Sequence, residues 1–262
     1  MSLPAWLGEG EAAEEWTSPP ETYLVIMELH DFLAFASREI SGVAVTAPFI
    51  NNTALNYAIN RGGVHRVASD QRPHYMEDFA SIRMYATPAR LLGIRSRGRL
   101  VDVEPVRITY NAVNTVLQVT EEYWSVSGKV KQRKVALPRL GAYLTYPPGT
   151  LFAFFCLGGR PPRVVRVGKK GAQATLKVYE AEKVKVAQGP HSPDHPLNPM
   201  DLPKGCKILQ ASLEPVPPAG LLTSARVTSP HLRAIFQDPI TGKEREFKIT
   251  LPSRGIYRSL GA

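Results

Sequence analysis

The chain has 262 residues, of which 44% are hydrophobic and 21% charged, a composition that can supply a sizeable core and excludes global disorder. Its longest apolar run is too short for a membrane-spanning helix, and its first residues lack the pattern of a signal peptide. Two cysteines, Cys156 and Cys206, provide neither a disulfide framework nor a CxxC pair. We therefore expect a cytoplasmic protein with no membrane partner.

The formal net charge of +9 is unevenly distributed along the chain. Residues 1–21 hold five glutamates and no lysine or arginine, which leaves +14 on the remainder. A body this basic favours a polyanion, because lysine and arginine release the counterions that condense on phosphates. Low β-propensity and like charge predict that residues 1–21 form an acidic, flexible N-terminal tail.

Residues 23–59 read as a strand, an irregular crossing and a helix. Residues 23–29 are nearly all β-prone and apolar, which predicts a strand buried on both faces. Asn51 and Asn52 can cap a helix in which Leu55, Ala58 and Ile59 share one face. Ferredoxin-like and RRM-like α+β units begin with this order of elements, and so do many other α+β folds.

Positive charge concentrates between residues 90 and 139, where ten bases oppose four acids. Residues 90–99 form a basic loop around two glycines. Residues 106–113 and 116–126 alternate as strands do, and residues 127–134 then turn into a second cationic strand. We expect a basic hairpin arm that projects from the sheet.

The last third of the chain is rich in strands and proline. Residues 174–186 alternate as one long strand. Prolines at 190, 193, 196 and 199 have the spacing of a polyproline helix, which predicts an extended arm that braces the fold. Residues 208–251 read as further strands, with a hairpin signal at 238–242.

Catalytic signatures are missing: the sequence has no GxSxG elbow, no HExxH motif and no phosphate-binding P-loop. His191 and His195 lie near two aspartates in sequence, but the proline arm does not place them on one helical face as metal ligands. Gly168–Gly171 has the spacing of a KH-domain phosphate clamp, yet strand-like segments flank it, so we predict a hairpin turn. We expect no enzyme activity, no cofactor and no bound metal.

Five segments, taken in order, resemble one known family. They are residues 28–40, 52–58, 85–90, 108–112 and 195–203. The ordered set is similar to CRISPR-associated protein five of type I-D systems, a RAMP protein that forms the foot of that Cascade complex. The resemblance spans roughly residues 22 to 258.

The resemblance implies an RRM-like domain at 22–188 with an inserted β-hairpin thumb, and a proline-rich arm and β-rich region at 189–262 on the same body. It implies a non-catalytic Cascade subunit that binds the 5′ handle of the CRISPR RNA and caps the backbone filament. Its implied partners are the CRISPR RNA, the backbone subunit, the large subunit and target double-stranded DNA near the PAM. In such systems base pairing reads the target sequence.

Candidate RNA-binding residues follow from charge and loop position, since no family motif fixes them. They are Arg38, Arg61, His65, Arg66, Arg95, Arg97, Arg99, Lys129, Lys131, Arg133, Lys134, Arg139, Tyr143, Lys169 and Lys170. Two alternatives stay open. One is a metal-independent endoribonuclease that processes CRISPR repeat RNA, with His65 as base beside Arg61 and Arg66. The other is a general basic RNA-binding protein.

Overall fold

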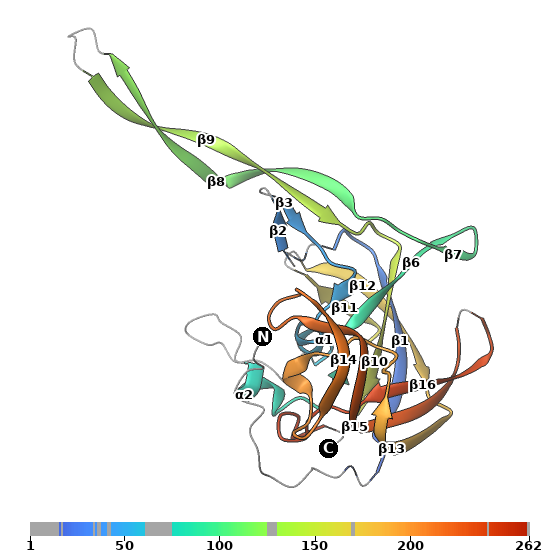
Figure 1. Cartoon of the computed structure of the whole chain (residues 1–262). Coiled ribbons are helices and arrows are strands. Elements are labelled where there is room, and N and C mark those ends of the chain that lie inside the picture. Colours follow the sequence, from blue (N-terminus) through green and yellow to red (C-terminus); the bar gives the residue numbers. More distant parts are fainter. Residues whose placement is uncertain are drawn as a thin grey trace.

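The computed structural model describes residues 16, 18–33, 35, 38–40, 43–60, 75–124, 130–168, 171–239 and 241–260. This part of the chain is mostly β-sheet, with sixteen strands and little helix (Figure 1). The helices are α1 (Asn52–Ile59), α2 (Tyr75–Phe79) and the 3-10 turn η1 (Pro199–Asp201). The helical share of the predicted α+β class is therefore small.

The first sheet is antiparallel and has β1 in its interior. Along the sheet lie β11 (Val164–Val167), β12 (Ala172–Glu180), β1 (Thr22–Leu29), β10 (Thr150–Leu157), β6 (Ala89–Ser96) and β4 (Phe49–Ile50). Two short strands extend it, with β5 (Tyr85–Ala86) on β10 and β7 (Arg99–Val101) on β6. Both neighbours of β1 come from distant parts of the sequence.

The second sheet is built around the long strand β15 (Leu221–Gln237). Its partners are β13 (Lys183–His191), β14 (Lys207–Glu214) and β16 (Glu244–Thr250). The prediction of one strand over 174–186 is wrong, because the chain changes sheets between β12 and β13. Ala181 N still donates to Thr22 O in the first sheet, whereas Glu182 N donates to Ile235 O in the second.

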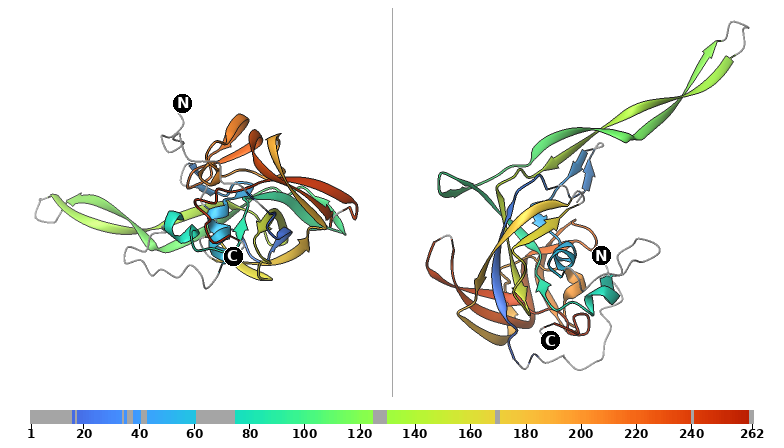
Figure 2. Two further views of the ribbon diagram at one scale, coloured as in Figure 1. Left: turned by 90° about the horizontal axis from the view of Figure 1, so that it is seen from below. Right: turned by 180° about the vertical axis from the view of Figure 1, so that it is seen from behind.

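The third sheet carries the predicted hairpin arm, called the thumb from here on. It consists of β8 (Val106–Trp124) and β9 (Val130–Thr145), with the short strands β2 (Arg38–Ile40) and β3 (Val43–Val45) beside its base. The β8–β9 register shifts between Ala112 and Val116, where the sequence pattern also breaks. Figures 1 and 2 show the thumb projecting far beyond the body, as predicted for this arm.

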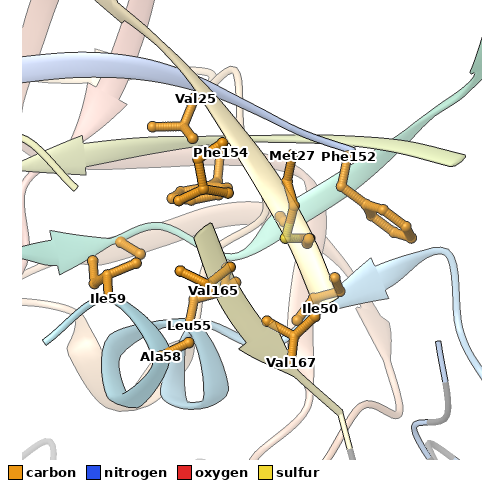
Figure 3. Close-up of a cluster of buried hydrophobic side chains, with 14 of the residues drawn as sticks. Val25, Met27, Ile50, Leu55, Ala58, Ile59, Phe152, Phe154, Val165 and Val167 are labelled. Atoms are coloured by element: carbon orange, nitrogen blue, oxygen red, sulfur yellow. The ribbon is translucent and has the colours of Figure 1, made fainter. Parts of the chain in front are cut away.

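The strand β1 separates two hydrophobic clusters. Val25, Met27 and Leu29 pack on the side of α1, together with Leu55 and other residues of that helix (Figure 3). The alternate residues Leu24 and Ile26 pack on the opposite side, against residues of β15 and β16. Because successive side chains of a strand point to opposite faces, both faces of β1 are buried, as the apolar run predicts.

The segment before α1 and the segment after β13 form hydrogen bonds with the rest of the fold. Asn51 is the predicted N-cap of α1, and its side chain accepts a hydrogen bond from Thr53 N. The proline arm also braces the fold, as expected: Leu197 exchanges backbone hydrogen bonds with Leu222. Near the N-terminus, the guanidinium carbon of Arg254 lies 4.7 Å from the centre of the Trp16 ring.

Candidate nucleic-acid interface

The prediction of a loop over residues 90–99 is wrong, because most of this segment is strand β6, which pairs with β7. The resulting β6–β7 hairpin presents three arginines to solvent. Ser96 pairs with Arg99, and the two residues between them have positive φ, 47° at Arg97 and 76° at Gly98. A two-residue turn of this kind matches the natural twist of a hairpin and keeps it short. Arg95, Arg97 and Arg99 are all exposed, and none of them forms an ion pair within the described residues.

Two arginines of the second sheet are paired with carboxylates. Arg233 forms a 2.9 Å ion pair with Glu246, and Arg245 lies 3.5 Å from Asp194. These carboxylates neutralise part of the local charge, so a phosphate would have to compete with them. Other exposed cations of this sheet, such as Lys183, Lys185 and Arg226, form no ion pair within the described residues, so accessible charge is not confined to the β6–β7 hairpin.

Five more of the predicted residues lie on β9 of the thumb, and four of them are cations. By backbone register, Lys131 lies opposite Tyr123, Arg133 opposite Glu121, Lys134 opposite Thr120, and Arg139 opposite Ala112. Lys131, Arg133 and Lys134 thus lie at the outer end of the hairpin, and Arg139 lies near the middle of β9.

The base of the thumb holds a row of residues across all four strands of the third sheet. Arg38 pairs with Val45, Val45 with Leu144, and Leu144 with Arg107. Three strand spacings separate the two arginine backbones, roughly 14 Å. Tyr143, next to Leu144, is half-buried in this junction. The row joins two residues that lie 69 positions apart in the printed sequence.

Arg107 is exposed but is not among the predicted site residues. It contributes to the positive charge counted over residues 90–139, yet it lies inside a predicted strand, and the candidates were chosen mainly from loops. The available signal was its place in an alternating strand next to the basic loop. Strand pairing, which the sequence does not reveal, places Arg107 in the same row as Arg38, three strands away.

Six predicted residues lie outside the part of the chain that the structure describes: Arg61, His65, Arg66, Lys129, Lys169 and Lys170. The loop that contains the last two is nevertheless bounded by described residues. Strands β11 and β12 pair antiparallel, and Gly171 N donates to Gly168 O at 3.0 Å. The predicted hairpin turn is confirmed, so the glycine pair does not join two helices as a KH clamp does.

The described basic elements do not converge on one point. The β6–β7 hairpin and the thumb leave the same end of the body but extend in opposite directions (Figures 1 and 2). The row from Arg38 to Arg107 lies between them, at the thumb's base. By backbone position these basic residues follow an elongated path, suited to a chain of phosphates rather than to a small ligand.

A second group of polar residues is buried instead of exposed. Asp201 accepts hydrogen bonds from Tyr257 at 2.6 Å, from Asn52 at 2.5 Å and from Tyr85 at 3.2 Å. Burial raises the pKa of Asp201 to about 6, although these three hydrogen bonds act in the opposite direction. Burial, with Asp201 nearby, also raises the pKa of both tyrosines. This network, called the Asp201 network below, joins α1, β5, η1 and the C-terminal segment.

The histidines of the proline arm are also structural. His195 accepts from Thr250 N at 3.1 Å through Nε2, and its Nδ1 lies 2.7 Å from Pro196 O. Burial lowers the pKa of His195 to about 4. His191 stacks on His231 with ring centres 3.8 Å apart. Both nitrogens of His195 are thus engaged with the backbone.

Among the described residues, no three His, Cys, Asp or Glu side chains gather closely enough to hold a metal ion. None of the helices in this part of the chain has the length and apolar character that crossing a membrane requires.

Comparison with known proteins finds one family model, described as type I-D CRISPR-associated protein Cas5/Csc1, which matches residues 20–258. No curated protein sequence matches the chain. Among solved structures, one similar chain comes from the cryo-EM structure of the type III-B Cmr-beta complex bound to cognate target RNA and AMPPnP. The match has 10% sequence identity and a TM-score of 0.42, and covers 78% of this chain and 86% of the other.

Proposed function

Because the chain belongs to the type I-D CRISPR-associated Cas5/Csc1 family, we propose that it is a non-catalytic subunit of a type I-D Cascade effector in the cytoplasm. In this proposal it binds the 5′ handle of the CRISPR RNA and caps the backbone filament. It also contacts the large subunit near the point where target DNA enters and its PAM is read.

The observation that carries the proposal is the exposed charge at one end of the body. Arg95, Arg97 and Arg99 form no ion pair within the described residues, and the thumb that starts at the same end carries further cations along β9. Phosphate contacts of this kind position a nucleic acid without reading its sequence. A subunit that holds a fixed RNA handle needs mainly such positioning, since pairing with the guide reads the target.

An RRM-like core is part of the proposal. The order β12-β1-β10-β6 puts the first strand beside the last one, and α1 follows the first strand in the chain. This order and its antiparallel pairing are those of a ferredoxin-like unit. The thumb would then be an insertion between the second and third strands. The strand β11 stands where such a unit has its second helix, which explains the small helical content.

We further propose that the subunit has no nuclease activity of its own. Metal-free cleavage of RNA needs a general base near the 2′-hydroxyl and a cation for the phosphate. Of the described histidines, His191, His195 and His231 are buried within the fold, and the exposed His30 lies 2.5 Å from the hydroxyl of Thr175 through Nε2. His65 remains the candidate for the ribonuclease alternative and lies outside the described residues. Repeat RNA incubated with the purified protein, with and without divalent metal, should stay intact; specific cleavage that is lost in His65→Ala would support the ribonuclease.

The principal test is to purify the chain together with the products of its neighbouring genes and to sequence any bound RNA. A CRISPR RNA with one constant 5′ end is the expected result. Recovery of unrelated RNAs of mixed sequence would support a general RNA-binding protein instead. Recovery of the assembled proteins without RNA would contradict the proposal.

A further inference from the structure

Trp16, the first residue that the structure describes, is docked on the body. It is half-buried and packs on the hydrophobic cluster that includes residues of β15, β16 and the C-terminal segment. The guanidinium carbon of Arg254 lies over its ring, so a cation–π contact adds to the apolar burial. Residues 1–15 lie outside the described residues. Trp16, called the anchor below, therefore fixes the place on the body at which they join the described chain.

A pocket of about 270 Å³ lies at the N-terminus of α1, beside Asn51. Its walls are mostly aromatic and apolar, and include Phe35, Phe49, Tyr57, Tyr75, Pro217 and Pro218. The four rings are half-buried, so an apolar occupant would remove more of their surface from water. No charged side chain is among the described residues that line the pocket. Its volume is slightly below the range of pockets for whole small molecules, which begins at about 300 Å³, so it suits a single large side chain.

A row of aromatic rings connects the pocket with the anchor. The ring of Tyr57, in the pocket wall, lies 5.6 Å from that of Phe79. Phe79 in turn stacks on Tyr257 at 5.6 Å, and Tyr257 follows Arg254 by three residues in the C-terminal segment. Tyr57 and Trp16 also pack on the same hydrophobic cluster. The pocket and the anchor thus lie on one continuous apolar surface.

A second tryptophan precedes the anchor at a distance that can reach the pocket. Trp6 comes ten residues before Trp16. Ten residues of extended chain span at most about 35 Å, long enough to follow the row of rings from the anchor to the pocket wall. Trp6 also lies within residues 1–8, which hold no charged side chain and include Leu3 and Leu7. Such a segment suits a pocket without charged walls.

The residues between the two tryptophans are complementary in charge to the surface near the anchor. They hold no lysine or arginine and four glutamates: Glu9, Glu11, Glu14 and Glu15. Arg254 is half-buried and Arg258 is exposed, and neither forms an ion pair with another described residue. These arginines would attract the acidic residues that lead to the anchor.

A segment of the same chain has an advantage over a free partner as the occupant. A short flexible linker holds its end at an effective concentration of about 1 mM, roughly a thousandfold above a partner at micromolar concentration. The family match begins at residue 20, so this tail lies outside the region that the chain shares with the family. The occupant is therefore best sought in this chain itself.

We propose that the pocket at α1 receives Trp6, and that residues 1–15 thereby dock on the body of their own subunit. The indole would cover the half-buried rings of Tyr57 and Tyr75, and the acidic residues would lead from the pocket to the anchor beside Arg254. The inference does not depend on the proposed function, because the occupant belongs to the chain. Occupied in this way, the pocket is closed to side chains of other proteins and to small molecules.

The test is fluorine NMR of the full chain labelled with fluorotryptophan, since the sequence holds only three tryptophans. Trp6→Phe and Trp16→Phe assign two resonances, and the third belongs to Trp124. In the wild type the Trp6 resonance should differ from its position in the urea-unfolded chain, as expected for an indole packed on other rings.

A pocket-filling substitution and a matched control follow. Ala54→Leu fills the pocket from α1, where Ala54 lines it and is half-buried, and leucine is a good helix former. It should return the Trp6 resonance to the unfolded position and leave the Trp124 resonance in place. Ala187→Leu on β13 is the same change at a half-buried position of the second sheet, and should move none of the three resonances.

Two results would overturn the inference. One is a Trp6 resonance at the unfolded position in the wild type; if Ala54→Leu then weakens association with the copurifying subunits, the pocket holds a side chain of a partner. The other is a shifted Trp6 resonance that a folded Ala54→Leu leaves in place, because the indole would then dock elsewhere.

A measurement on the wild type covers the case in which Ala54→Leu does not fold. The protons of the Trp6 indole should show nuclear Overhauser effects to the methyl group of Ala54, and their absence would contradict the site. RNA binding is read separately, so failure of the proposed function and failure of this inference can be told apart.

Discussion

Tyr257 donates a 2.6 Å hydrogen bond to Asp201, and so fastens the C-terminal segment to the end of the proline arm. Asn52 and Tyr85 donate to the same carboxylate. Asn52, Tyr85 and Asp201 each belong to a different segment of the set that resembles the family. The family pattern in these three segments therefore includes side chains that hold the body together.

Tyr257→Phe should lower the free energy of unfolding by about 1.5–3 kcal/mol, the usual range for a hydrogen bond to a charged group. The ring itself is preserved, including its stacking on Phe79 at 5.6 Å, so the loss reports on the hydroxyl. Urea denaturation with an unchanged m-value is the measurement.

Tyr23→Phe is the matched control. Its hydroxyl lies 3.0 Å from Glu21 in a partly buried place outside the Asp201 network, and its loss should change stability by about 0.5 kcal/mol or less. Equal losses of unfolding free energy in the two variants would show that the hydrogen bond to Asp201 contributes no more to stability than the one to Glu21.

Acidification should destabilise the fold between about pH 6.5 and pH 4. Burial lowers the pKa of His195 and of His191 to about 4. In this range the unfolded chain binds protons that the folded histidines do not, so their contribution is complete above the unfolded pKa and declines as pH falls. Asp201 has the opposite sign, since its raised pKa of about 6 makes the folded state bind the proton more readily.

Burial also lowers the pKa of His231, so three histidines act against one carboxyl and the melting temperature should fall from pH 7 to pH 4.5. Asp201→Asn removes the opposing contribution, so this variant should show a steeper decline than the wild type, from a lower starting value. A melting temperature that rises on acidification, or a shallower slope in the variant, would refute the assignment of these groups.

The thumb should hold RNA through phosphates. Replacing Lys129, Lys131, Arg133 and Lys134 by alanine should weaken binding to many RNA sequences alike. The slope of log K against log salt should become shallower by roughly 0.7 for each lost contact with single-stranded RNA, about 3 at most.

Because the sequence predicts that these charges project from the hairpin, stability should stay within about 0.5 kcal/mol of the wild type. A natively folded variant with an unchanged salt slope would remove the thumb from the RNA surface. A contact with another protein subunit would then explain its charge better.

Gly93 should be indispensable for the β6–β7 hairpin. Its φ is +129°, and a Cβ at this position would lie 2.3 Å from the carbonyl oxygen of Val101. The backbone conformation alone should cost Gly93→Ala about 1–3 kcal/mol, and relief of the clash should displace β7 and with it Arg99. Gly98→Asn is the control, because open space surrounds Gly98 and asparagine tolerates positive φ. Equal stability of both variants in thermal unfolding would contradict this.

The sequence predicts best where the physical cause is local. The apolar run of β1, the cap at Asn51 and the turn at Gly168–Gly171 follow from residues within a few positions of one another. The change of sheet at Ala181 does not, because an alternating pattern shows that a strand has two faces but not which sheet it joins. Arg107 and the pocket at Asn51 were missed for a related reason: pairing and packing between distant segments create both.

The geometry of the thumb has a consequence for measurements on the isolated subunit. Strand β8 is 19 residues long, roughly 60 Å, whereas β3 pairs with β9 only over residues 142–144. A two-stranded ribbon without a third strand is marginally stable in water. Amide hydrogens of the outer thumb should exchange through local opening, far faster than those of β1 and β10. The free energy of RNA binding to the free subunit must then include the cost of ordering this ribbon. An assembly that clamps the ribbon in advance would remove that cost, and the same RNA would dissociate from it more slowly.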